Sequence, residues 1–207
     1  MSRDKITIIH LFLFLVVIAV FIWSLIKPTE GYLIWFLEVS PSIVVLIIAV
    51  KTYSKIRFTT LSYFIIALLT ILTFIGGHYS YSKVPLFNWI KDHFDLQRNH
   101  YDRFGHFLKG LIVILIREIL LRISPLTKGK LLAFITLSIS LAIGALYEIV
   151  EWASSMVTKG TKTTKDFLGM QGDKWDAQWD MSLLLIGSIL ALMLLSKLHN
   201  RSLKDKI

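Results

Sequence analysis

The chain has 207 residues, of which 55% are hydrophobic, and its formal net charge is +9. A mean hydropathy of +0.64 excludes an ordinary soluble globular protein. The absence of cysteine excludes disulfides, thiolate nucleophiles, thiolate-bound zinc and attached c-type haem. The positive charge accompanies apolar segments and no base-reading module, so it indicates membrane topology and attraction to anionic lipid. We expect membrane lipid as a partner and no nucleic acid.

Six apolar stretches of about 17 to 20 residues predict transmembrane helices, because helices of that length cross the hydrocarbon core. They cover about residues 8–26, 33–50, 58–76, 104–121, 131–150 and 181–198. The predicted fold class is therefore all-α, a polytopic bundle of six transmembrane helices that forms one domain over residues 1–207. The first stretch lacks a small-x-small cleavage site and is long for a signal peptide, so we expect it to remain as a span.

Basic residues divide unequally between the two sides of these spans. One side, with both termini and the second and fourth loops, holds twelve Lys or Arg and two acids. The other side holds nine basic residues and eight acids in longer loops. Because short, acid-poor basic loops stay in the cytoplasm, we expect a multi-pass cell-membrane protein with both termini cytoplasmic.

The third loop has a pattern of its own. Between Val84 and Tyr101, apolar residues recur at near-helical spacing beside charged ones, which predicts a short helix in the outer interface. All six tryptophans also fall at the predicted outer ends, where an interfacial aromatic belt explains most of them.

The fourth span opens with YDRFGHFLKG, which carries a polar stripe. Asp102 and His106 are four residues apart, and Lys109 and Arg117 follow on nearly the same helical face. Charged groups in contact with lipid are costly, so the stripe is expected to face the bundle interior or a wet cavity. The alternative is a buried ion-pair ladder in which Arg117 and Glu118 hold helices together.

The fifth span ends in YEIVEW, which places Glu148 and Glu151 one turn apart. Burial disfavours the charged form of a carboxyl group unless a cation or metal compensates, and general bases and proton carriers are tuned in this way. The alternative is that Glu148 pairs with His106 or Arg103 for structure only, while Glu151 lies in interfacial water.

The most distinctive stretch is FLGMQGDKWDAQWDM, just before the last span. If the last helix starts near Asp173, then Asp173, Asp176 and Asp180 share one face and are predicted ligands of a divalent metal ion. Capping and complementation of the helix dipole is the competing explanation.

Two more groups point to the same end of the bundle. Glu38 lies near the outer start of the second span, and GGHYSY places His78 just past the outer end of the third. If these helices are neighbours, the acidic and imidazole groups line one outward-facing polar cavity, which is where we expect the function to lie.

These motifs carry a resemblance to known families. GGHYSY, YDRFGHFLKG, EIVEW and FLGMQGDKWDAQWDM, in this order, closely resemble the YjdF-like family of bacterial membrane proteins of unknown function, over nearly the whole chain. A more distant similarity reaches the VanZ-like family, with its pattern D-[KR]-x-x-H, E-x-x-Q and D-x-x-x-N-x-x-G. The residues that fit this pattern are Asp102, Arg103, His106, Glu148, Asp180 and Gly187. Glu151 and Leu184 replace the Gln and the Asn of that family. The VanZ-like resemblance implies a link to glycopeptide tolerance and the cell envelope.

Three function classes follow. The first is an enzyme acting on a lipid or lipid-linked envelope precursor, with His106, Glu148 and Asp102 as catalytic residues and a divalent metal as a candidate cofactor. Its predicted substrate-binding residues are Arg103, Lys109, His78, Glu38, Glu151 and Gln178. The second class is an ion-coupled transporter or flippase, against which the lack of inverted repeats and of a broken mid-membrane helix argues. The third is a structural or partner-binding membrane protein.

Overall fold

The computed structural model describes residues 3–157 and 171–203, and these residues form helices and no strands. In chain order the elements are α1 (Arg3–Ser24), α2 (Tyr32–Thr52), α3 (Thr60–Tyr79), the 3₁₀ turn η1 (Tyr81–Lys83), α4 (Pro85–His93), α5 (Tyr101–Lys109), α6 (Ile112–Ile123), α7 (Lys130–Val157) and α9 (Asp176–Leu203). The predicted all-α class is confirmed.

Five of these helices are long and apolar enough to cross a membrane, namely α1, α2, α3, α7 and α9. Their outward faces carry large apolar side chains, such as Phe12 at 63% exposure and Leu194 at 73%. Such surfaces are stable against lipid tails and unstable against water. The chain is a multi-pass membrane protein.

The fourth predicted span, residues 104–121, is not one helix, and this corrects the prediction of six continuous spans. It is divided between α5 and α6 by a tight turn, in which Gly110 N–H donates to Phe107 O (3.3 Å) and Leu111 N–H to Leu108 O (2.9 Å). The sequence pattern alone missed the break because both halves are apolar on one face, and the glycine at the turn is also compatible with a continuous helix.

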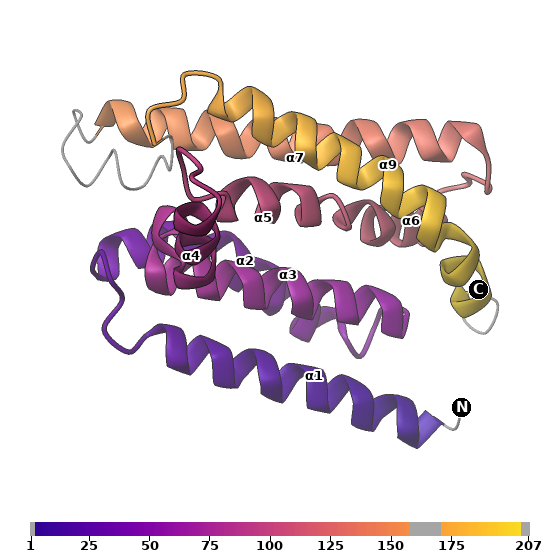
Figure 1. Cartoon of the computed structure of the whole chain (residues 1–207). Coiled ribbons are helices and arrows are strands. Elements are labelled where there is room, and N and C mark those ends of the chain that lie inside the picture. The colour runs from indigo at the N-terminus through magenta and orange to yellow at the C-terminus, as the bar shows by residue number, and fades with distance from the viewer. Residues whose placement is uncertain (1–2, 158–170, 204–207) are drawn as a thin grey trace.

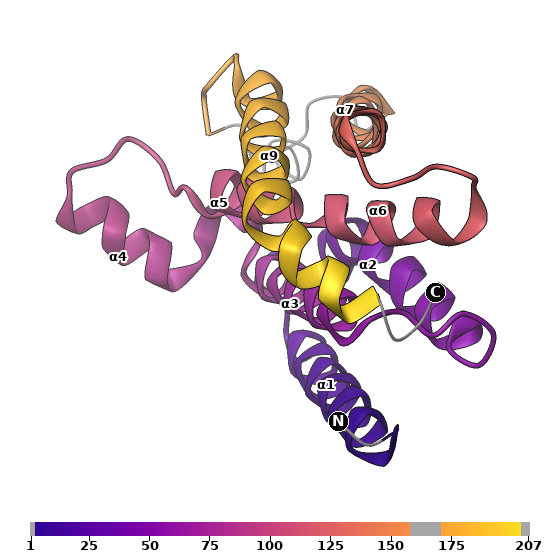
Figure 2. The same ribbon diagram turned by 90° about the vertical axis from the view of Figure 1, so that its right-hand side faces the viewer.

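α5 runs along the middle of the bundle, with α7 and α9 on one side of it and α2 and α3 on the other (Figure 1). α1 packs on the outer side of α3, away from α5. Figure 2 shows that α6 instead lies across the bundle, as does α4 at the opposite end. A helix therefore exists in the third loop as predicted, while its position at the membrane interface remains a prediction.

A close contact of main chains fixes α5 against α9. An added Cβ at Gly187 would overlap the Phe107 carbonyl oxygen, and one at Gly110 would overlap the backbone nitrogen of Ser188. The Ser188 hydroxyl donates to Gly110 O (3.2 Å) and lies 2.9 Å from the Ser140 hydroxyl of α7. Small residues thus admit the break, and the Ser188 hydroxyl joins Val113 N–H in donating to the Gly110 carbonyl at the turn.

The first turn of α1 and the last turn of α9 lie at the same end of the bundle (Figure 1), so both termini share one side. Which side is cytoplasmic can be tested in this cysteine-free chain. We expect an impermeant maleimide added to intact cells to label Lys91→Cys and Lys165→Cys and to spare Lys55→Cys, because Lys55 lies in a basic, acid-poor turn. Lys165 falls outside the described residues. Labelling of Lys55→Cys with the other two protected would invert the topology.

Candidate functional site

Three helices bring together a cluster that we call the carboxylate–histidine cluster: Asp102, His106 and Lys109 of α5, Glu148 of α7 and Asp180 of α9. One ligand atom each of Asp102, His106 and Asp180 lies within 4.8 Å of the other two. His106 Nε2 lies 3.6 Å from Asp102 Oδ1 and 3.7 Å from Glu148 Oε1. His106 is 1% exposed and Asp180 2%, so the cluster is closed off from bulk solvent.

Lys109 determines the protonation state and tautomer of His106. Its Nζ lies 2.9 Å from His106 Nε2 and 4.4 Å from the centre of the Tyr147 ring. An ammonium group only donates, so Nε2 accepts and the imidazole is neutral with its proton on Nδ1. Among the described residues that Nδ1 has no hydrogen-bond partner. The Nδ1–H tautomer of His106 is thus assigned from the fact that the Lys109 ammonium can only donate.

The cluster has unused hydrogen-bonding capacity. Glu38 Oε2, Glu148 Oε1 and Asp180 Oδ1 are buried and find no hydrogen-bond partner within residues 3–157 and 171–203. Buried polar atoms are normally paired, because an unpaired one costs about 1–3 kcal/mol. Two of these atoms, Glu148 Oε1 and Asp180 Oδ1, belong to the cluster, and unpaired buried oxygen atoms in one cluster are typical of a site that receives a ligand, an ion or water.

Two arginines pair with Asp173 and Asp176, the other two predicted metal ligands. Arg98 forms an ion pair with Asp176, and Arg103 forms one with Asp173. The hydrogen bond from Trp175 N–H to Asp173 Oδ1 (2.9 Å), together with Arg103, holds the pKa of Asp173 below its usual range. Asp173 and Asp176 therefore have cationic partners, and of the three aspartates predicted to bind metal only Asp180 lies in the carboxylate–histidine cluster.

A cavity of about 170 Å³ lies beside the cluster, between α2, α3, α5, α6, α7 and α9. Its polar end is formed by Glu38, Tyr81, His106, Lys109 and Tyr147. The remaining walls are mainly apolar and include Val45, Ile65, Leu69, Ile112, Leu115, Ile143 and Leu184. The cavity therefore has a charged end and a hydrocarbon-like end.

The other predicted site residues lie apart from this cavity. His78 stacks near Trp23, with ring centres 4.2 Å apart, and its Nδ1 lies 3.3 Å from Ser24 O. Gln178 is exposed on α9, and Glu151 is half-buried one turn beyond Glu148. Their predicted roles in substrate binding remain predictions.

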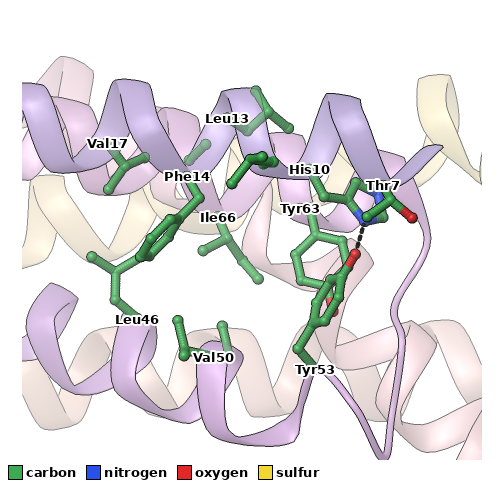
Figure 3. Close-up of a pocket in the computed structure, with 13 residues that line it drawn as sticks. Thr7, His10, Leu13, Phe14, Val17, Leu46, Val50, Tyr53, Tyr63 and Ile66 are labelled. Carbon is green, nitrogen blue, oxygen red and sulfur yellow. Dashed lines mark hydrogen bonds between the residues drawn. The ribbon is translucent and has the colours of Figure 1, made fainter. Parts of the chain in front are cut away.

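A larger cavity of about 330 Å³ lies between α1, α2 and α3 (Figure 3). Apolar side chains such as Leu13, Phe14 and Val17 line most of it, and no carboxylate does. At one end His10 lies 3.0 Å from the Tyr53 hydroxyl. This mainly apolar cavity suits a hydrocarbon chain, and its imidazole is engaged by the Tyr53 and Thr60 hydroxyls.

Glu118 is the centre of a second polar group at the opposite end, the Glu118 network. Its carboxylate accepts hydrogen bonds from Thr59 N–H (2.8 Å), the Ser62 hydroxyl (2.5 Å) and Arg122 Nη2 (2.6 Å). His199 Nε2 lies 3.3 Å from it, and Arg117 donates to His199 Nδ1 (2.7 Å). The network joins α3, α6 and α9 at an end of the bundle away from the cavity, and it matches the ion-pair alternative proposed for Arg117 and Glu118.

Comparison with known proteins shows which family the chain belongs to. Residues 9–201 match the family described as "Predicted membrane protein (DUF2238)". The chain belongs to the DUF2238 family. It is 38% identical over 173 residues, 83% of this chain and 82% of the relative, to the inner membrane protein YjdF of Escherichia coli (strain K12). No solved structure matches. The YjdF-like resemblance is confirmed.

Sequence reasoning did not single out three residues of this DUF2238 protein: Tyr147, which lies beside Lys109, His199 of the Glu118 network, and Arg98, which pairs with Asp176. Arg98 was assigned only to the interfacial segment, Tyr147 is the first residue of YEIVEW, and His199 was part of the basic tail. Their partners lie far away in sequence, as in the Arg98–Asp176 pair, which spans 78 residues. The one local signal for Tyr147 is that it adjoins Glu148 in YEIVEW.

Proposed function

We propose that this chain binds the phosphate headgroup of a membrane lipid, or of a lipid-linked envelope precursor, and cleaves its phosphorus–alcohol bond with His106 as general base and acid. The observation that supports this most directly is the division of the cavity beside the carboxylate–histidine cluster. Its charged end is suited to a headgroup, and its apolar walls are suited to the adjoining hydrocarbon. The choice of an envelope precursor rests on the VanZ-like pattern, which remains a prediction.

The substrate enters from the side in this proposal. Val45 of α2 and Ile143 of α7 line the cavity and are also exposed on the lipid-facing surface, at 37% and 43%. An amphiphile in the bilayer reaches the cavity between these two helices without leaving the membrane. Its headgroup then meets Lys109, whose ammonium binds phosphate as a point charge.

Release of Lys109 toward a headgroup frees His106 Nε2, the nitrogen to which the ammonium donates. Nε2 then takes the proton of a water molecule or hydroxyl group as its oxygen bonds to the headgroup phosphorus. The phosphorus–alcohol bond breaks, and the departing alcohol takes the proton from His106. Asp102 and Glu148, 3.6 and 3.7 Å from Nε2, stabilise the transient imidazolium.

The headgroup assignment can be tested by lipid retention. We expect native mass spectrometry of the detergent-purified protein to show bound anionic lipid, which Lys109→Met weakens by about tenfold or more through loss of a charge-assisted contact. Ile143→Trp should also lower retention, because it fills the apolar walls without altering charge. Lys91→Met removes a partly exposed lysine on α4 and is the matched control. Equal retention in all four proteins would contradict the proposal.

A transporter is the second candidate, and the break between α5 and α6 favours it, because broken helices form the binding sites of many transporters. This reverses the argument made from the sequence. Against it, Ile65, Val113 and Ile114 form a buried apolar cluster on α3 and α6, two of the helices between the two polar groups. Proton flux in proteoliposomes, with lipid retention unaffected by Lys109→Met, would favour transport.

A further inference from the structure

The carboxylate–histidine cluster has more acidic groups than cations. Asp102, Glu148 and Asp180 converge on His106, while Arg98 and Arg103 are engaged by Asp176 and Asp173. Among the described residues, Lys109 is the cation within hydrogen-bonding distance of the cluster. Buried carboxylates without compensation must take up protons or recruit positive charge.

The positions of the ligand atoms fit a metal ion. An ion with bonds of about 2.1 Å in tetrahedral geometry holds its ligand atoms about 3.4 Å apart. The contacts of His106 Nε2 with Asp102 and Glu148 are 3.6 and 3.7 Å, and the Asp102, His106 and Asp180 atoms lie within 4.8 Å. Shifts of about 1 Å or less in side-chain position would therefore suffice.

Independent of the number of acids, two oxygen atoms are buried there without a hydrogen-bond partner in the described part of the chain. They are Asp180 Oδ1, on a residue that is 2% exposed, and Glu148 Oε1, on a side chain that is 9% exposed. Glu148 Oε1 faces His106 Nε2. A cation bound at this point would give both oxygen atoms a partner.

We propose that Asp102, His106 and Asp180, with Glu148, bind one divalent transition-metal ion, and that Lys109 is the resident cation that the metal displaces. One imidazole and several carboxylates suit Zn²⁺ or Mn²⁺ better than Mg²⁺, which prefers oxygen ligands and retained water. The Lys109 ammonium already lies 4.4 and 5.6 Å from the centres of the Tyr147 and Tyr81 rings, which can hold it by cation–π contact when it leaves His106. Metal binding does not rest on the proposed function, and the two describe alternative states of the cluster, because a metal-bound Nε2 has no lone pair left to take a proton.

Metal binding is measured on the full chain in detergent after treatment with chelator, by titration with Co²⁺ and Zn²⁺. We expect visible Co²⁺ absorption of a nitrogen- and oxygen-ligated site, one equivalent of Zn²⁺, and a thermal midpoint that rises with metal concentration. Asp180→Asn and His106→Gln should weaken binding at least tenfold. Asp92→Asn, an exposed acid of α4 with 72% side-chain exposure, is the matched control and should bind like the wild type.

Each remaining outcome decides a separate point. Without metal, Asp180→Asn should unfold no earlier than the wild type, because it removes a buried charge and keeps the side-chain shape, so weak binding would not reflect misfolding. No saturable binding by the wild type, or equal binding by Asp180→Asn, overturns the metal site. Lys109→Met should tighten binding by removing a competitor, and unchanged or weaker binding overturns displacement. Lipid retention in metal-free protein tests the headgroup proposal separately.

Discussion

Replacing Gly187 with valine should prevent α5 from packing on α9 and destabilise the fold by about 3 kcal/mol or more. A Cβ at this position would overlap the carbonyl oxygen of Phe107, which is main chain and has no alternative rotamer. The two helices would have to separate along their contact, and the carboxylate–histidine cluster that spans them would separate with them. The measurement is the thermal midpoint of the detergent-solubilised protein, followed by size-exclusion fluorescence.

Gly129→Val is the matched control, because a Cβ at Gly129 would have no atom within 4 Å. It makes the same chemical change in the loop before α7 and should leave the midpoint within a few degrees of the wild type. Similar midpoints for the two valine variants would show that α5 and α9 do not approach so closely.

The second large effect is expected for Glu118→Ala. Glu118 is 0% exposed and accepts hydrogen bonds from α3 and α6, while His199 contacts it from α9. Its removal leaves Arg122 without its buried partner, and breaking a buried pair in this way costs about 3–5 kcal/mol. The expected result is a thermal midpoint lowered by ten degrees or more, or loss of the folded protein during purification.

Glu30→Ala is the matched control, since Glu30 pairs with the partly exposed Lys83 and such pairs contribute about 1 kcal/mol or less. Glu118→Gln keeps the side-chain shape, so its thermal midpoint should lie between those of the two alanine variants. If Glu118→Ala has the same thermal midpoint as Glu30→Ala, the Glu118 network does not hold the helices together.

The sequence predicted those features of the fold that depend on residues close together in the chain. Five of six spans follow from unbroken apolar runs, because a helix in lipid pairs its backbone groups within itself. The break after Lys109 depends on contacts of Gly110 with Gly187 and Ser188, which lie on another helix. Such a contact leaves no periodic signal in the sequence.

In the candidate site too, features set by residues close in sequence were predicted, and those set by distant residues were not. The helical spacing of Asp102 and His106 predicted that they share a face, and the structure brings them together at 3.6 Å. Asp176 and Asp180 lie four residues apart on α9, as the spacing predicted, but α9 begins at Asp176, so Asp173 precedes the helix. The pairing of Asp176 with Arg98 and of Asp173 with Arg103 could not be predicted, because these partners are distant in the chain. Helical spacing therefore identified the candidate residues but not their partners.

The short helix α5 constrains how this protein can be inserted during synthesis. Its nine residues include Asp102, Arg103, His106 and Lys109, and a charged residue at the centre of a helix opposes insertion by about 2.5–3.5 kcal/mol. Such a segment cannot partition into lipid by itself. Arg98, just before α5, finds its partner Asp176 only 78 residues later in the chain. We therefore expect α5 to take its place in the bundle only after α9 has been synthesised, and a chain truncated before α9 to leave α5 without the helix that it packs against.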